Sequence, residues 1–301
     1  MRSLEEWADA VWALAHGLEE KRMKKIVEII RDKGYKVELK DVNKNGVIKK
    51  AIAISPKDSA MAPVLYLDNY DFDGNTDEET ADFLIDIAKR HFADLSIDAE
   101  GLITWTNALK NLRVGLRTIA LDTYGDGLVT RRRFDMEEYL YIKVKVSGDK
   151  AGSIKITEQL FDNWHKGIEE VFDIAEQNTF ADCHYEDMRM ALFDADIPED
   201  VIGTLPPVTM YVISNDTKTN GAVGMLSVDI LAEIADQFEN DVYILPSSIH
   251  EVLAISAAEV KNVEDLEKMV YEVNTHEVSP EERLSYSVFF FNRETRELSK
   301  A

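Results

Sequence analysis

One short segment in the C-terminal third of the chain brings together side chains that could carry out hydrolytic chemistry. Ser247 and Ser248 are followed by His250 and Glu251, so that two hydroxyls, an imidazole and a carboxylate lie close together in the sequence. The segment follows a predicted strand, and ligands of α/β sheets often bind at strand ends. Two asparagines of a preceding loop add further polar groups. The candidate binding residues are therefore Ser247, Ser248, His250, Glu251, Asn215 and Asn220.

The same segment lacks the usual organisation of a hydrolase. A nucleophile and its base normally come from separate elements, with a third group that orients the base, whereas Ser248 and His250 are only two residues apart. The chain has no Gly-x-Ser-x-Gly sequence, and Ala254 stands where a metalloprotease helix needs its second histidine. We therefore favour a structural interpretation, in which the serines bond to turn backbone and His250 is a half-buried polar residue.

Three acidic stretches resemble the start of a calcium-binding loop. Calcium needs about seven oxygens, and the last ligand of its loop is normally a bidentate glutamate. In the stretches that begin at Asp41 and Asp122, Ile52 and Arg133 occupy that position, which favours turns. The weak candidate for a divalent ion is the oxygen-rich stretch with Asp71, Asp73, Asn75 and Asp77. We predict no metal site and no cofactor.

Two further groups could be reactive. Cys183 is the only cysteine, and the acids beside it, such as Asp182, would raise the pKa of its thiol, so we interpret it as structural. The basic run from Arg131 to Arg133 lies in an acidic chain, and we expect it to pair with neighbouring acids rather than bind phosphate.

The charge of the chain excludes some partners. The sequence has 57 acidic and 34 basic residues, a formal charge of −23, which disfavours direct binding to nucleic acid. Its apolar runs are far shorter than the ~20 residues of a membrane span, and acids interrupt the N-terminal segment where a signal peptide is apolar. We predict a cytoplasmic protein that does not bind membranes, whose partner is another protein. The oligomeric state is left open.

The periodicity of the sequence predicts an α/β chain of the α+β kind, with mixed sheets and packed helices in two coupled halves. A helical stripe covers residues 4–31, Asn45-Gly46 suits a hairpin turn, and Thr76 with Glu79 forms a capping box. The predicted division is an N-terminal half at 1–180, a connecting segment at 181–207 and a C-terminal half at 208–301. The C-terminal half has the predicted order β-β-α-β-β-α-β, in which 222–226 is the second strand.

The C-terminal half also carries a resemblance. The segments Met210 to Asn215, Asn220 to Ala222 and, above all, Tyr243 to Val252 resemble members of a bacterial family of unknown function found in gut Clostridia-like genomes. The resemblance continues through Val278 to Ser285 and is loose in the N-terminal half. It supports the fold and implies no activity, cofactor or catalytic residue.

Three functions remain compatible with these patterns. We favour a non-enzymatic protein-binding or regulatory module, which leaves enzymatic activity undecided but disfavoured. The alternative is a small hydrolase-like enzyme that uses Ser247 to Glu251. The second alternative is an acidic mimic of nucleic acid that inhibits a nucleic-acid-binding protein, with Asp68 to Glu79 and Glu169 to Glu186 as the stretches that would form its acidic face.

Overall fold

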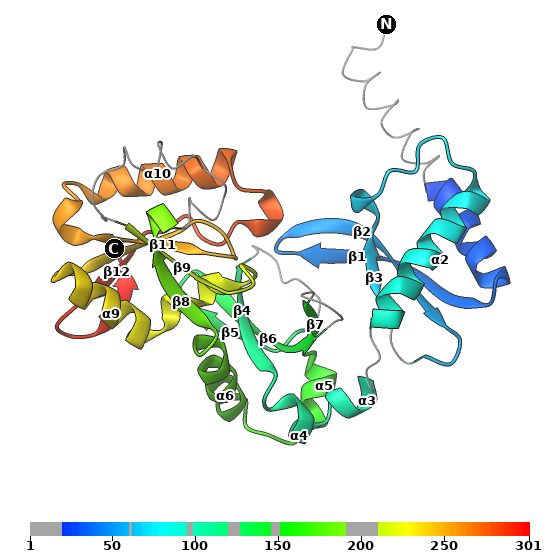
Figure 1. Cartoon of the computed structure of the whole chain (residues 1–301), viewed down its shortest axis with the longest axis horizontal. Helices are drawn as coiled ribbons and strands as arrows, with labels where there is room; N and C mark the ends of the chain where they lie inside the picture. Colours follow the sequence, from blue (N-terminus) through cyan, green and yellow to red (C-terminus); the bar gives the residue numbers. More distant parts are fainter. Residues whose placement is uncertain (1–19, 60–61, 95–98, 120–126, 146–150, 191–209) are drawn as a thin grey trace, which may run out of the picture. The chain divides into compact units, whose positions relative to one another are not determined.

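The computed structural model describes residues 20–59, 62–94, 99–119, 127–145, 151–190 and 210–301. The fold is mixed α+β, as predicted, and is built from helices and antiparallel sheets (Figure 1). The chain divides into two compact units. Unit 1 comprises Met1–Lys44, Ile48–Leu102 and Val146–Lys150, and unit 2 comprises Asn45–Val47, Ile103–Lys145 and Ala151–Ala301.

Unit 1 is a three-stranded sheet with two main helices. The strands, in the order β1-β2-β3, are β1 (Tyr35–Lys44), β2 (Val47–Pro56) and β3 (Val64–Tyr66). The helices are a segment at 20–32 and α2 (Asp77–Asp94), with the short elements η1 (Leu67–Asn69) and α3 (Ala99–Leu102).

Two local predictions, one at the β1–β2 turn and one at the start of α2, are confirmed. At the hairpin turn both Asn45 and Gly46 have positive φ, 51° and 88°, as a two-residue type I′ turn requires. At the start of α2, the N–H of Glu79 donates to Thr76 Oγ1 at 3.2 Å, and the N–H of Thr76 donates to Glu79 Oε2 at 2.8 Å. The hydrogen bonds that the N–H and the hydroxyl of Thr76 donate to the carboxylate hold the pKa of Glu79 below its usual value.

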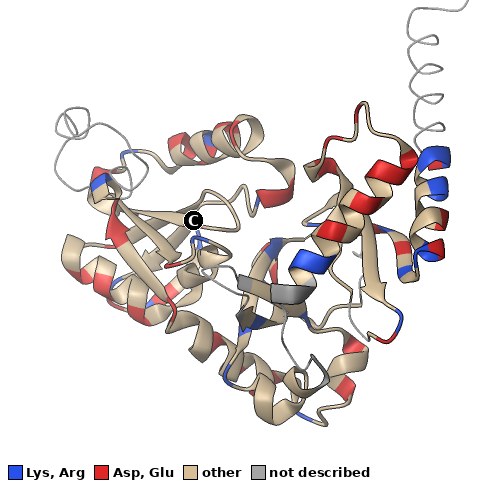
Figure 2. Cartoon of the chain, turned by 45° about the vertical axis from the view of Figure 1, so that its right-hand side comes forward, with Lys and Arg blue, Asp and Glu red and all other residues tan. Residues whose placement is uncertain are grey.

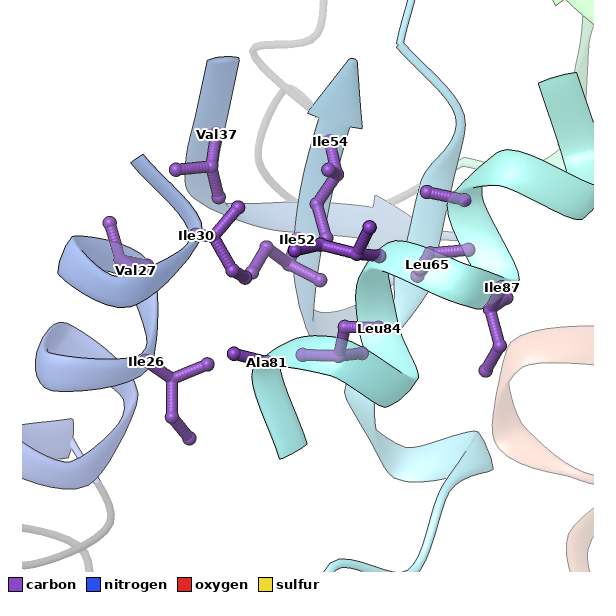
Figure 3. Packing of buried hydrophobic residues seen from close by; sticks show 12 residues of the cluster. Ile26, Val27, Ile30, Val37, Ile52, Ile54, Leu65, Ala81, Leu84 and Ile87 are labelled. Atoms are coloured by element: carbon purple, nitrogen blue, oxygen red, sulfur yellow. The ribbon is translucent and has the colours of Figure 1, made fainter. Parts of the chain in front are cut away.

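The core of unit 1 lies between the sheet and the helices. Ile52 and Ile54 of β2 are fully buried against Ile26 and Ile30 of the N-terminal helix and Leu84 of α2 (Figure 3). Burial of each such side chain stabilises the fold by roughly 1.5–3 kcal/mol. One face of the short sheet is therefore what holds the two helices in place.

Unit 2 contains two antiparallel sheets. In the first, β4 (Leu112–Thr118) pairs with one edge of β6 (Met136–Lys145), while β5 (Thr130–Arg133) and β7 (Ala151–Lys155) both pair with β6. The second has the order β13-β12-β10-β11-β9-β8. Its strands are β8 (Cys183–Asp187), β9 (Met210–Asn215), β10 (Val242–Pro246), β11 (Val252–Ser256), β12 (Phe289–Asn292) and β13 (Glu297–Lys300).

Helices and turns complete unit 2. The α-helices are α4 (Trp105–Ala108), α5 (Glu158–Asp162), α6 (Ile168–Phe180), α9 (Val228–Phe238) and α10 (Val263–His276). The 3-10 turns are η2 (Gly221–Leu226), η3 (Ala257–Glu259) and η4 (Pro280–Glu282). No helix in the described ranges is both long and apolar enough to cross a membrane.

One element of the predicted C-terminal order is wrong. The apolar run 222–226 is the 3-10 helix η2, not a strand, and its residues from Gly221 to Met225 are buried. A short, fully buried apolar run has no periodicity that separates a strand from a helical turn. The left-handed backbone of Asn220, with φ of 56°, starts the turn.

The two units divide the chain at different places from the predicted halves. Residues 103–145 and 151–180 group with the C-terminal residues, because β4 and α6 both contact η2. The ring of Phe134, which follows β5, also packs against the ring of Phe289 in β12, with centroids 5.2 Å apart. Most of the predicted connecting segment, residues 191–207, lies outside the described residues.

Candidate functional site

The structure brings several of the predicted binding residues together at one junction of unit 2. The N–H of Asn220 donates to His250 Nδ1 at 3.2 Å, and the N–H of His250 donates to Ser248 Oγ at 3.0 Å. The N–H of Ser248 in turn donates to the backbone oxygen of Glu251 at 3.1 Å. Strand β9 joins the junction because Ser214 Oγ donates to the backbone oxygen of His250 at 2.9 Å.

The other two predicted residues take different positions. The carboxamide of Asn215 organises its own loop: its oxygen accepts from Thr217 and Thr219, and its nitrogen donates to the backbone oxygen of Thr219. Ser247 is half-buried between β10 and Ser248. Within the described residues, neither side chain is hydrogen-bonded to the imidazole of His250.

The hydrogen bonds of His250 define what the ring can do. Because Nδ1 accepts from a backbone N–H, the neutral ring carries its proton on Nε2. That atom lies 3.5 Å from Glu282 Oε1 of η4. Ser248 Oγ accepts from the backbone of His250 instead of donating to its ring, so the described geometry contains no serine-to-histidine proton path of the kind that activates a nucleophile.

Gly221 shows how tightly this junction is packed. A Cβ atom on Gly221 would lie 2.6 Å from Ser214 Oγ, 2.7 Å from the backbone oxygen of His250 and 2.8 Å from the backbone nitrogen of Asn215. Two of these atoms belong to the backbone and cannot move aside cheaply. The space between the segments is therefore filled by the protein itself, with no room there for a substrate group.

We expect His250→Ala to lower the free energy of unfolding by about 1–2 kcal/mol, through lost packing and hydrogen bonds. The backbone N–H of Asn220 would lose its acceptor, and Glu282 would lose its neighbour. Urea unfolding of the variant beside the natural protein measures this loss. An unchanged unfolding curve with loss of a hydrolytic activity would instead support the hydrolase alternative.

Arg22 occupies the middle of the stretch predicted as a weak divalent-ion site. Its guanidinium donates to Asp77 Oδ1 at 3.1 Å, to the backbone oxygen of Asn75 at 2.6 Å and to Thr80 Oγ1 at 3.3 Å. Asp71 accepts from the backbone N–H of Asp73 at 2.9 Å. In the part of the chain that the structure describes, no group of three or more His, Cys, Asp or Glu residues could hold a metal ion.

We therefore expect millimolar calcium to leave the melting temperature of the protein unchanged relative to a magnesium-free sodium chloride buffer of the same ionic strength. An arginine already neutralises the carboxylate of Asp77, and the stretch lacks a full ligand set. A calorimetric scan with and without the ion measures this. A rise of several degrees that is specific to calcium would contradict it, because only a bound ion stabilises by mass action.

A groove of about 820 Å³ lies in unit 1. Its apolar lining comes from the N-terminal helix, from Leu39 of β1 and from the segment after β3, and charged side chains surround it. The lining residues are Glu20, Arg22, Met23, Lys24, Ile26, Leu39, Lys40, Asp41, Lys50, Ala51, Leu67, Asp68, Tyr70, Asp71, Phe72 and Asp73. No sequence motif indicated this groove, since its walls come from four separate segments.

One side of the groove is formed by the same face of strand β1 that is buried in the core of unit 1. Side chains alternate between the faces of a strand, so Leu39 and Asp41 share the face of the buried Val37. Leu39 keeps 38% of its surface exposed, and Asp41 pairs with Lys50 of β2 at 2.6 Å. The face that is buried farther along the sheet is thus open to solvent at this end.

A buried charge network in unit 2 was also not predicted as a unit. Oε2 of the fully buried Glu138 accepts from Arg131 Nε at 2.8 Å and from Arg133 Nε at 3.0 Å. Glu176 Oε1 of α6 lies 2.7 Å from an outer nitrogen of each arginine. The guanidinium of Arg131 also stacks 4.5 Å above the ring of Phe172. The prediction that this basic run pairs with acids is confirmed for Arg131 and Arg133.

Asp135 forms a second node that the sequence did not indicate. Its Oδ2 accepts from Ser285 Oγ at 3.1 Å, from Ser287 Oγ and from Lys300 Nζ at 3.2 Å. Burial opposes ionisation, but these donors hold the pKa of Asp135 below its usual value. The node ties the turn between β5 and β6 to the last strand of the chain.

Cys183 has the environment of a structural residue. Burial, with a smaller effect of the neighbouring Asp182, raises the pKa of its thiol to about 12. Because the thiolate is the nucleophilic form, burial and this raised pKa disfavour a role as a nucleophile and support the structural interpretation.

Comparison with known proteins gives one result that concerns the whole chain. A protein-family model matches residues 18–293, and the family that it represents has no known function. No curated protein and no solved structure matches the chain.

Proposed function

Because the chain belongs to DUF5688, a family of unknown function, membership assigns no activity, and we propose one from the geometry. We propose that this protein is a non-enzymatic binding module and that the groove of unit 1 holds a segment of a partner protein. We place this binding in the cytoplasm, because a sequence with a single cysteine suits a reducing compartment.

The observation that carries the proposal is the open end of the sheet face in unit 1. The groove of about 820 Å³ has the size of known ligand sites and combines apolar walls with a few polar groups. The half-buried side chains of Met23, Leu67 and Phe72 border the groove. Each would bury more apolar surface, away from water, if an apolar residue of a partner entered the groove.

The hydrolase alternative has less support in the geometry. His250 does lie close to a polar group from another element, Glu282. However, Ser248 Oγ accepts a hydrogen bond from the backbone N–H of His250 and not from its ring. Gly221 packs closely against both neighbouring segments and leaves no space between them. A hydrolase needs a place beside its nucleophile for the scissile group.

The nucleic-acid mimic would need its acids on one face. Acidic residues, drawn in red in Figure 2, occur on α2 of unit 1 and also on α9 and α10 of unit 2. The two acidic stretches, Asp68 to Glu79 and Glu169 to Glu186, belong to different units. The acids are thus spread over several elements, which favours binding by local complementarity over binding by total charge.

A photo-crosslinking experiment tests the proposed function. The photoreactive residue p-benzoylphenylalanine replaces Leu39, which lines the groove, or the adjacent Glu38, whose side chain points to the opposite face of β1. After irradiation in the cells that make the protein, we expect a discrete adduct from the Leu39 position and none from the Glu38 position. Equal adducts at both positions, or none at either, would contradict a groove-bound partner.

A further inference from the structure

We infer that the groove of unit 1 selects a cationic segment: an arginine or lysine side chain, flanked by apolar residues, that lies against the wall formed by residues 67–73. This inference rests on the proposed function and names the chemistry of the partner. The expected preference depends on the acidic residues of this one wall and not on the net charge of the whole chain.

The sequence of the wall alternates carboxylates with aromatic rings. From Asp68 to Glu79 the chain has six acidic residues and no basic residue. Asp68, Asp71 and Asp73 are exposed at the groove, and the rings of Tyr70 and Phe72 stand between them. Carboxylates attract a cation, and the face of an aromatic ring adds about 0.5–1 kcal/mol at an exposed site.

The rings are held in place by packing. Tyr70 lies edge-on to Phe83, with ring centroids 5.8 Å apart, and Phe72 lies edge-on to the same ring at 6.3 Å. Tyr70 and Phe72 also pack against the core of unit 1. A preformed wall of this kind loses little side-chain entropy when a ligand binds.

Most basic residues of the groove are already paired within unit 1. Arg22 is bound to Asp77 and two backbone oxygens, Lys24 pairs with Glu20 at 2.7 Å, and Lys50 pairs with Asp41. Among the described residues, Lys40 is the basic lining residue that forms no ion pair. Of the acidic residues in the wall, Asp68 is paired with Lys49, whose Nζ lies 3.3 Å from Asp68 Oδ2.

Two carboxylates of the wall, Asp71 and Asp73, remain free of ion pairs within the described residues. They therefore outnumber the single unpaired base, and the groove presents a net negative wall to its occupant. A cationic side chain on the occupant complements that wall, whereas an acidic one would be repelled.

Three acetylated and amidated peptides test the inference. The first is Gly-Leu-Arg-Ser-Leu-Arg-Gly, and in the others both arginines are replaced by glutamine or by glutamate. Amide chemical shifts of the full-length, ¹⁵N-labelled protein report both location and affinity. We expect the arginine peptide to shift amides of the groove and to bind at least about tenfold more tightly than the glutamine peptide, with an affinity that falls as salt is raised.

Matched variants assign the effect to the wall. We expect the double variant Asp71→Asn and Asp73→Asn to reduce the affinity for the arginine peptide about fivefold to tenfold. The control, Asp32→Asn with Asp58→Asn, removes two exposed acids of unit 1 that do not line the groove, and we expect it to change the affinity less than about twofold, because distant exposed charges are screened.

The outcomes separate the two proposals. If the glutamine peptide shifts the groove amides and binds as tightly as the arginine peptide, the cationic preference is refuted while the groove remains a peptide site. If none of the three peptides shifts any groove amide, both the preference and the proposed use of the groove are refuted.

Discussion

Replacing Glu138 with alanine is expected to lower the free energy of unfolding by about 3–5 kcal/mol, because the change leaves buried charges without their partner. Arg131 and Arg133 both donate to Glu138 Oε2, and Arg131 keeps only 16% of its side chain exposed. The variant would also leave a cavity between the sheet and α6. Urea unfolding followed by circular dichroism measures the loss.

Glu138→Gln is the matched control. The amide fills the same volume and keeps an oxygen that accepts from the arginines, so we expect a smaller loss than for alanine.

The stability contributed by Glu138 depends on pH with a sign that is unusual for a carboxylate. Burial, with a smaller effect of Glu176, raises the pKa of Glu138. Its contribution to stability is therefore fully present below the pKa of the unfolded chain and declines as pH rises towards the higher folded pKa. Equal stability of the alanine variant and the natural protein would contradict this account.

Gly221→Ala is expected to lower the free energy of unfolding by about 3 kcal/mol, at the upper end of the usual cost of overpacking. The added methyl group would collide with two backbone atoms and with the hydroxyl of Ser214, so β9 and the segment of His250 would have to move apart. Differential scanning calorimetry measures the resulting fall in melting temperature.

Gly167→Ala serves as the comparison. There the nearest atom to an added Cβ is 4.0 Å away, and φ is −69°, which alanine adopts without strain. Gly167 is the N-cap of α6, where alanine is less favourable than glycine, so we expect this variant to cost less than about 1 kcal/mol, well below the cost at Gly221. If Gly221→Ala is as stable as Gly167→Ala, the junction around His250 has free space, and the hydrolase alternative regains support.

Much of the fold was predictable from the sequence where the determining contacts are local. The capping box of Thr76 and Glu79 and the turn at Asn45-Gly46 are fixed by residues that lie next to each other in the chain. The 3-10 helix η2 was mispredicted because its conformation depends on packing against distant strands, such as the approach of Gly221 to β9.

The candidate sites divide in the same way. Grouping Asn220 with His250 anticipated a real contact, whereas the groove of unit 1 arises from four segments that no spacing connects. The buried network did leave a signal in the sequence. In β6 the core positions alternate through Met136, Leu140 and Ile142, and Glu138 falls in the same register. A carboxylate at a core position requires a buried cation, and the adjacent arginine run supplies it.

The pairing of β6 has a consequence for how unit 2 opens. Both edges of this strand are hydrogen-bonded, one by β4 and the other by β5 and then β7, so its backbone amides have no edge that frays independently. Exchange of these amide hydrogens with solvent requires several strands to separate at once. Amide exchange in the part of β6 that is paired on both edges, Met136 to Ile142, should therefore be slow, and it reports the rate or free energy of opening the whole sheet.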